Sequence, residues 1–154
     1  MKQKELIIKI INYIDENIYT KISIDNLSSV FYFNKDYIMR LFKRELGITI
    51  NNYINYKRVY LSLSDLENSN NTILYVGLNN GFYSLEYFSE IFKKTIGVSP
   101  SIYRNYYKYR KDINEEEFYL INNKKNQLIN KIEEINKYKT IIKSKDVLVL
   151  SIFK

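Results

Sequence analysis

An internal repeat constrains this chain more than any other feature of its sequence. Residues 34–47 read NKDYIMRLFKRELG, and residues 84–97, 50 positions later with no gap, read SLEYFSEIFKKTIG. Apolar residues recur in both copies with the spacing of one face of an α-helix. Asn34 and Ser84 are residue types that cap helix starts, and a glycine closes each copy at 47 and 97. The repeat therefore predicts two similar amphipathic helices, presented together to one elongated partner.

A short helical pattern and a turn precede each copy. Ser23 and Thr72 can cap these short helices, which end at turns near Tyr32 and Gly81. A short helix, a turn and a capped second helix form a helix-turn-helix pattern. Residues 50–68 carry apolar side chains on more than one side, as expected for a connector. The prediction is an all-α fold, in which two helix-turn-helix subdomains are joined by a long linker helix, after a first helix over about 3–17.

The chain beyond the repeat is harder to interpret. We expect residues 1–110 to form the double helix-turn-helix domain and residues 111–154 to form a C-terminal extension. The extension begins with a helix, and residues 147–153, VLVLSIF, are β-like and pair with 140–142 in a short β-hairpin. A lone hairpin is marginal in water. The segment therefore docks on the body, serves dimerisation, or starts a truncated second domain. The predicted helix carries one apolar stripe: Ile121, Leu128, Ile132, Ile135 and Tyr138.

Net charge indicates the class of partner. The chain carries 24 basic and 17 acidic residues, a formal charge of +7, and its pI is about 9.3. Such a balance favours a polyanion, most often nucleic acid and in some proteins an anionic membrane surface. No stretch reaches the roughly 18 apolar residues that a membrane span requires. The first 17 residues lack the features of a signal peptide, so we expect a cytoplasmic protein.

The composition argues against an enzyme. The chain has neither His nor Cys, which removes the commonest general base, the thiolate nucleophile and the usual zinc ligands. Its four glycines form no phosphate-binding loop. We therefore expect no catalytic residue, no metal site and no cofactor.

Longer motifs identify a family. The segments IS..NLS (22–28), N..YI.RLFK...G (34–47), YI...R (53–58) and GF.S..YFS..FKK..G.SP..YR (81–104) resemble the DNA-binding domain of the AraC/XylS family of bacterial transcription regulators. The resemblance covers roughly residues 5–108. It implies a sequence-specific double-stranded DNA-binding transcription regulator, favoured as an activator, with RNA polymerase as a further partner. The family's two recognition helices enter successive major grooves.

The resemblance also implies which residues contact DNA. In the first recognition helix it assigns base contacts to Asp36, Met39 and Arg40, of which Arg40 is favoured because a guanidinium can bond a guanine edge twice. Phosphate contacts fall to Asn34, Lys35 and Lys43. The second helix supplies base contacts from Leu85, Glu86, Ser89 and Glu90, with Ser84 and Lys93 directed to phosphate.

This sequence departs from the family's pattern in the second helix. The family commonly has a basic residue where Glu90 stands and a small polar one where Glu86 stands. Carboxylates repel phosphates, although a glutamate can accept a hydrogen bond from cytosine. The alternative function is therefore a protein-interaction or sensor module whose second DNA-reading helix has degenerated. The resemblance starts near Met1, so we expect any effector-sensing or homodimerising part to lie in residues 111–154.

Several residues have simpler explanations beside the functional ones. Arg40 and Lys43 are also compatible with an ordinary solvated basic face. Arg58 and Arg104 are expected to make structural ion pairs or caps. The tyrosines at 103, 106, 107 and 109 could stack on single-stranded bases, but their helical context favours packing.

Overall fold

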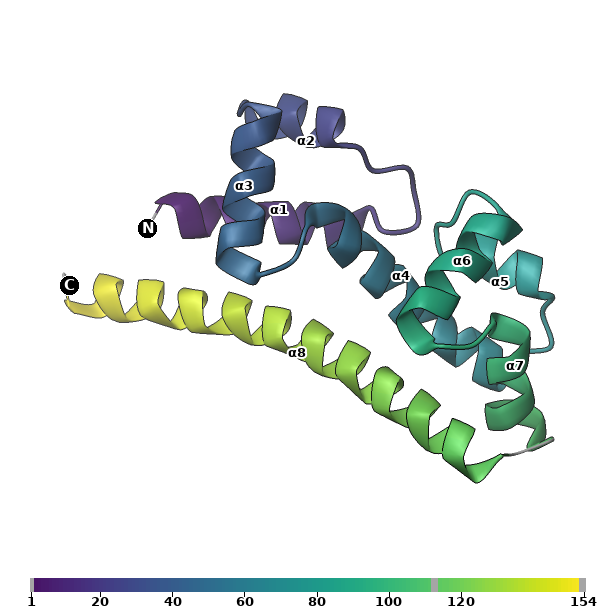
Figure 1. Ribbon diagram of the computed structural model, residues 1–154. Coiled ribbons are helices and arrows are strands. Elements are labelled where there is room, and N and C mark those ends of the chain that lie inside the picture. The colour runs from purple at the N-terminus through teal and green to yellow at the C-terminus, as the bar shows by residue number, and fades with distance from the viewer. Residues whose placement is uncertain (1, 112–113, 153–154) are drawn as a thin grey trace.

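The computed structural model describes residues 2–111 and 114–152, and these residues form helices and turns with no strand. The first unit contains α1 (Lys2–Glu16), α2 (Ile24–Phe31) and α3 (Lys35–Leu46), and the long linker α4 (Ile50–Asn68) follows it. The second unit contains α5 (Ile73–Asn79), α6 (Leu85–Ile96), α7 (Pro100–Arg104) and a π-helical turn, η1 (Asn105–Tyr109). The last helix is α8 (Glu115–Ile152). The all-α prediction of two helix-turn-helix subdomains joined by a linker helix is confirmed (Figure 1).

Side-chain caps fix where most of these helices begin. Each predicted cap accepts a backbone N–H two or three residues ahead, which satisfies a donor that the first helical turn leaves unpaired. Ser99 plays the same role in front of α7, where Pro100 occupies the first helical position. The residues that cap α2 to α7 are Ser23, Asn34, Thr49, Thr72, Ser84 and Ser99.

The two units bury the same type of core around matching aromatic pairs. Phe42 lies 6.0 Å from Tyr53, and Phe92 lies 5.5 Å from Tyr103, both measured between ring centroids. The hydroxyl of Tyr53 donates to Asp15 Oδ1 at 2.6 Å, and that of Tyr103 donates to a Glu67 carboxylate oxygen. Both rings are almost fully buried, so each hydroxyl needs the carboxylate as its partner.

The linker α4 belongs to both units, as its two apolar sides predicted. Tyr53 and Ile54 face the first core, while Leu63 and Leu66 lie toward the second half of the helix. The helix contacts α3 on one side and α5, α6 and α7 on the other. A single rigid element therefore fixes the distance between the two helix-turn-helix units.

The helix α8 lies along both units and joins them a second time (Figure 1). Its Lys139 Nζ is 3.3 Å from Asp15 Oδ2 in the first unit, and its Lys125 Nζ is 2.7 Å from Glu67 Oε1 in the last turn of α4, beside the second unit. These are the same carboxylates that hold Tyr53 and Tyr103. The predicted apolar stripe of α8 faces the body, with Ile121, Leu128, Ile132 and Ile135 buried and Tyr138 packed against the core.

The predicted β-hairpin is wrong. Residues 140–142 and 147–152 belong to α8, and Phe153 lies outside the described residues. No Gly or Pro interrupts the chain after Pro100, so a helix already formed can propagate through β-branched residues. The Thr140 hydroxyl donates a hydrogen bond to the Asn136 carbonyl at 3.1 Å, and the Ser144 hydroxyl donates one to the Thr140 carbonyl at 3.0 Å. The domain boundary near residue 110 and the roles suggested for the extension stay predictions.

Candidate nucleic-acid interface

The helix α3 is held so that one face is buried and the other is free. Ile38, Leu41 and Phe42 are buried in the first core. The Asn34 side chain accepts the Asp36 N–H at 2.8 Å, which starts the helix. Gly47, with φ 75°, accepts the left-handed conformation that ends it. Packing and caps together set the rotation of the helix about its axis.

All six residues predicted for the first recognition helix are exposed. Lys35 pairs with the Asp25 carboxylate of α2, so its charge is partly engaged. Arg40 Nε lies 3.3 Å from the Asp36 carbonyl oxygen, which directs the guanidinium along its own helix. The six exposed residues are Asn34, Lys35, Asp36, Met39, Arg40 and Lys43.

The helix α6 begins and ends like α3 but exposes different side chains. Ser84 accepts the Tyr87 N–H at 3.0 Å and Gly97 ends the helix with φ 97°. Glu86, Glu90 and Lys93 are exposed, whereas Ser84, Leu85 and Ser89 are half-buried. The structure thus places the two predicted sets of residues on separate helices and makes the second set less accessible than the first.

Charge separates the two helices further. The exposed positions 36, 39, 40 and 43 carry Arg40 and Lys43 against one carboxylate, so cations are in excess. The equivalent positions 86, 89, 90 and 93 carry Glu86 and Glu90 against a single lysine. A polyanion is therefore attracted by the first helix and repelled by most of the exposed charge of the second.

Arg58 and Arg104 have structural roles, as the sequence suggested. Arg58 donates from Nε to the Ile18 carbonyl at 2.9 Å and from a terminal nitrogen to that of Thr20 at 2.7 Å. Arg104 donates to the carbonyls of Leu66 and Asn71 at 3.1 and 2.5 Å. Both arginines are buried, and burial lowers the pKa of Arg58 from its ordinary value.

Gly81 lies where the two units meet. A Cβ at this position would come within 2.5 Å of the Ile18 carbonyl oxygen and 2.7 Å of Arg58 Nε, and its φ is 94°. No other residue type fits such a close backbone approach without displacing it. The turn of the second unit is therefore packed against the Arg58 contact of the first.

Most of the tyrosines considered for base stacking are part of the core. Tyr103 and Tyr106 are buried, and Tyr103 stacks on Tyr107 with centroids 4.3 Å apart. Burial and then the hydrogen bond to Glu67 raise the pKa of Tyr103 far above its ordinary value, and burial and Asp15 act likewise on the pKa of Tyr53. Tyr109 is the exposed member.

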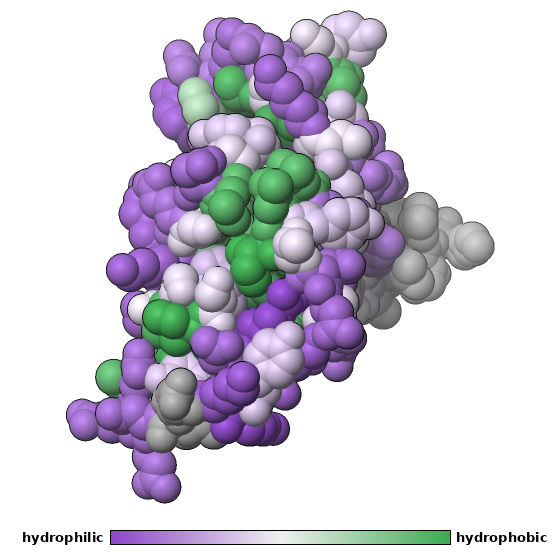
Figure 2. Space-filling model, turned by 90° about the vertical axis from the view of Figure 1, so that its right-hand side faces the viewer, coloured by the Kyte–Doolittle hydropathy of each residue, from purple (hydrophilic) through white to green (hydrophobic). Residues whose placement is uncertain are grey.

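An exposed apolar patch distinguishes the second unit from the first. Figure 2, which shows the side where α5 and α7 lie in Figure 1, displays apolar side chains gathered at the centre of a polar surface. Leu74 and Leu78 of α5 and Ile102 of α7 are each more than two-fifths exposed. Two of the equivalent positions in the first unit are polar, Ser28 and Asn52. This surface lies outside the predicted site residues.

Sequence reasoning missed a group of lysines. Lys94, Lys124 and Lys131 line a cavity between α4, α6 and α8. The spacing of Lys124 and Lys131, seven residues apart beside the apolar stripe of α8, was a usable signal. Their position opposite α6 depends on how α8 docks, which the stripe alone does not determine.

Within the part of the chain that the structure describes, no group of three or more acidic residues is arranged to hold a metal ion. Over the same residues, no helix is both long and apolar enough to cross a bilayer.

The chain is similar to known helix-turn-helix proteins. Residues 27–106 match the protein family described as "Helix-turn-helix domain". The multiple antibiotic resistance protein MarA of Escherichia coli is 30% identical over 75 residues, which are 49% of this chain and 59% of MarA. The chain thus spans about three-fifths of the length of the curated relatives it matches.

Solved structures share the arrangement. The C-terminal domain of the two-component response regulator YesN from Fusobacterium nucleatum is 27% identical, with a TM-score of 0.61 over 68% of this chain and 99% of that domain. The DNA-binding domain of the global transcriptional factor AdpA, solved with a target DNA, has a TM-score of 0.63 at 21% identity, over 70% of this chain and 97% of that one. At this identity, the similarity to the AdpA domain is a similarity of fold.

Proposed function

Because the chain belongs to the AraC-type helix-turn-helix family, we propose that it is a sequence-specific double-stranded DNA-binding transcription regulator. The observation that carries this proposal is the duplicated helix. α3 and α6 are capped alike, buried alike and joined by one linker, while each exposes its own set of polar side chains. Two such helices suit successive major grooves of one duplex.

The first helix is the stronger reader in this proposal. Arg40, exposed and free of any carboxylate partner among the described residues, is assigned a bidentate contact with a guanine edge. Asp36 and Met39 lie one turn before and beside it and supply further base contacts. Asn34, Lys35 and Lys43 are assigned to phosphate.

The second helix is assigned a narrower role. Glu86 and Glu90 can accept hydrogen bonds from cytosine amino groups, and Leu85 can contact a thymine methyl. Ser89 adds a hydroxyl, and Ser84 and Lys93 are directed to phosphate. Since Leu85, Ser89 and Ser84 are half-buried, insertion of α6 contributes less affinity than insertion of α3.

Activation and the remaining partners are inferred at the level of the family. We propose an activator that acts through contact with RNA polymerase. Residues 1–110 serve as the DNA-binding domain and residues 111–154 as an extension.

The exposed side of α8 carries Tyr119, Leu120 and Ile141, which would be available to a second copy of the chain. Light scattering of the purified chain across a concentration series distinguishes a homodimer from a monomer.

In vitro selection of bound duplexes tests the proposal. The chain should enrich one motif with two parts about one helical turn apart, and footprinting should show protection of both parts. Affinity should fall steeply between two salt concentrations, because lysines and arginines displace counterions from phosphate. Recovery of random duplexes with no enriched motif would contradict sequence-specific binding.

The exposed carboxylates favour a second candidate, a protein-interaction or sensor module with a degenerate second reading helix. Neither Glu86 nor Glu90 pairs with a lysine or arginine among the described side chains, so both charges face outward uncompensated. A selected motif with one part rather than two, or no salt-sensitive duplex binding, would support this candidate instead.

A further inference from the structure

The helix α8 contacts the C-terminal end of both proposed reading helices. On α3, the Tyr138 hydroxyl donates to Glu45 Oε2 at 3.2 Å, in the last turn of the helix. On α6, the Lys124 side chain passes close to Gly97, the residue that ends the helix, and a Cβ at Gly97 would lie 3.1 Å from Lys124 Cδ. One helix from outside the repeat therefore touches α3 and α6 at the same end.

Two partly buried ion pairs hold α8 against the body. Lys139 Nζ lies 3.3 Å from Asp15 Oδ2 of α1, and Lys125 Nζ lies 2.7 Å from Glu67 Oε1 in the last turn of α4. The four side chains are 21–26% exposed, so these pairs are less screened by water than a surface pair. The apolar stripe of α8 between the two lysines is buried. The helix is thus fixed to the body beside each unit.

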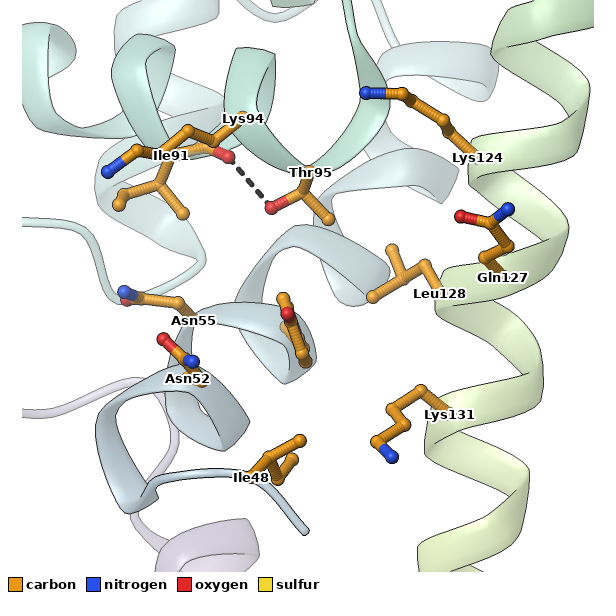
Figure 3. Close-up of a pocket in the computed structure, with 11 residues that line it drawn as sticks. Ile48, Asn52, Asn55, Ile91, Lys94, Thr95, Lys124, Gln127, Leu128 and Lys131 are labelled. Atoms are coloured by element: carbon orange, nitrogen blue, oxygen red, sulfur yellow. Dashed lines mark hydrogen bonds between the residues drawn. The ribbon is translucent and has the colours of Figure 1, made fainter.

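The two units leave a space between them on the side where α8 docks. Figure 3 shows Ile91 and Thr95 of α6 on one wall of this space, Ile48 on another and Leu128 of α8 on a third. Together with their neighbours they enclose a cavity of about 690 Å³. Side chains on separate walls do not interlock as those of a packed core do, so direct packing of the units does not fix their angle here. The link across this side is made by α8.

We propose that α8 is a positioning element for DNA binding, which sets the distance and the angle between α3 and α6 through its positioning residues Lys125, Tyr138 and Lys139. This inference rests on the proposed function. The linker α4 and the close approach of Gly81 to the Ile18 carbonyl also join the units, and the separate attachments of α8 restrict rotation about those links. Two helices held at one spacing bind a duplex of matching spacing best, because insertion of the second helix is then effectively intramolecular.

A pair of variants with the same chemical change tests the role of α8 in the full chain. Leu128→Asp/Ile132→Asp should detach α8, because both side chains are buried and an unpaired buried carboxylate is costly. The matched control Leu120→Asp/Ile141→Asp adds the same two charges to α8 at positions that are 56% and 54% exposed. Circular dichroism checks that both variants are folded, and hydrogen exchange of α8 reports its detachment.

The polar contacts of α8 provide a second variant that keeps the apolar stripe. Lys125→Gln/Tyr138→Phe/Lys139→Gln removes the three positioning contacts, and its control Lys137→Gln/Lys143→Gln loses the same two charges from exposed positions of α8. The triple variant should change the two measurements that follow in the same direction as detachment, by a smaller amount. It decides the proposal if the aspartate variant does not fold.

The distance between the two reading helices can be measured without DNA. The chain has no Cys, so Lys43→Cys and Lys93→Cys place one spin label on α3 and one on α6, at exposed equivalent positions. Pulsed electron spin resonance should give one narrow distance distribution in the labelled parent and in the control. Detachment of α8 should widen it about twofold or more, because the units then sample several orientations. An unchanged width would overturn the proposal, since the other links would then be sufficient.

Affinity for duplexes of different spacing tests the consequence for DNA. The unlabelled parent should prefer the selected duplex about tenfold over one with an extra base pair between its two parts, which turns the second part by about 35°. The detached variant should show a preference of about threefold or less. Weaker binding with the preference unchanged would overturn the positioning role. If the parent enriches no motif at all, the proposed function fails, and the label distances alone decide whether α8 positions the two helices.

Discussion

The two helix-turn-helix units differ on the outside and agree on the inside. Phe42 and Tyr53 in the first unit match Phe92 and Tyr103 in the second, and in each unit the two rings pack together while the tyrosine hydroxyl donates to a carboxylate. The exposed position that Arg40 occupies in the first unit is occupied by Glu90 in the second, 50 residues later. Packing constrains a buried side chain from every direction, whereas an exposed one meets only water and its partner. The difference shows that one scaffold can carry two reading surfaces of opposite charge.

The two cores also differ at one pair of equivalent positions. Leu27 and Ile38 are both buried in the first unit, and the equivalent residues in the second are Gly77 and Phe88. A Cβ at Gly77 would lie 2.7 Å from Phe88 Cδ2. A large ring in the second core thus occupies the space that a leucine side chain would need. The two units therefore fill these two equivalent positions with different pairs of residues.

The largest expected effect comes from the shared phenylalanines. Phe42→Ala and Phe92→Ala should each lower the free energy of unfolding by about 3–5 kcal/mol, since each leaves a cavity in a fully buried site. Denaturant unfolding measures both losses. Tyr119→Ala, on the exposed side of α8, is the control and should change little. A small loss for one phenylalanine and a large one for the other would break the equivalence of the two cores.

Substitutions at Gly77 and Phe88 test whether these two residues compensate each other in the second core. Gly77→Leu should destabilise the chain by about 1–3 kcal/mol or more, because the added side chain meets the Phe88 ring. Adding Phe88→Ile recreates the pair of the first unit and should recover part of the loss in denaturant unfolding. Phe88→Ile alone should be destabilising through an unfilled cavity. Strictly additive effects of the two substitutions would show that these residues do not compensate each other.

The reading surfaces should respond in opposite directions. Arg40→Ala should weaken binding to the selected duplex by about 1–3 kcal/mol and relax the preference at one base pair. Glu90→Ala removes a charge that repels phosphate and should strengthen binding to random duplexes by at most about 1 kcal/mol. On the selected duplex the loss of the assigned cytosine contact should offset this gain. Fluorescence anisotropy at two salt concentrations measures both, with Lys143→Ala as the control. Unchanged affinity of Arg40→Ala for specific and random duplexes would place the reading face elsewhere.

The buried tyrosines should give the smallest and most equal effects. Tyr53→Phe and Tyr103→Phe each remove a hydrogen bond to a carboxylate and should cost about 1 kcal/mol at neutral pH. The folded-state pKa of both hydroxyls is raised, so their native form stays protonated while the unfolded form ionises above about pH 10. The parent therefore loses stability as pH rises through that value.

The double variant Tyr53→Phe/Tyr103→Phe separates these two hydroxyls from the other groups that titrate in alkali. Its unfolding free energy should depend less on pH above about 10 than that of the parent. Tyr138, whose pKa burial and Glu45 raise to about 12, stays in both chains and adds to the remaining slope. Tyr107, whose pKa burial and Glu67 also raise, does the same. An identical pH slope in the two chains would show that Tyr53 and Tyr103 are not protected from ionisation.

Local features were predictable from the sequence because they depend on neighbouring residues. Asn34, Ser84 and the glycines at 47 and 97 act within one helical turn, and the structure confirms them as helix ends. The exposure of Arg40 followed from the spacing of Ile38 and Phe42. Long-range features were not predictable in this way. The half-burial of Leu85 and Ser89 and the lysine cavity depend on how separate helices dock.

The structure of the C-terminal extension, residues 111–154, was also only partly predictable from the sequence. The strand prediction for residues 147–153 rested on β-branched composition, which is a weak preference that context overrides. The stripe from Ile121 to Tyr138 predicted a helix correctly, but it did not reveal which surface would cover it. That surface is composite, with Asp15, Glu45 and Glu67 drawn from three separate helices. How these three come together is a property of the assembled body.

The docking of α8 has a consequence for folding. Lys139 and Asp15 are 124 positions apart, and Tyr138 and Glu45 are 93 apart. Within each helix-turn-helix unit the helices that meet are close in sequence, so their contacts close shorter loops. Contacts between residues far apart in sequence slow folding. We therefore expect the contacts between α8 and the first unit to form after the contacts within each unit.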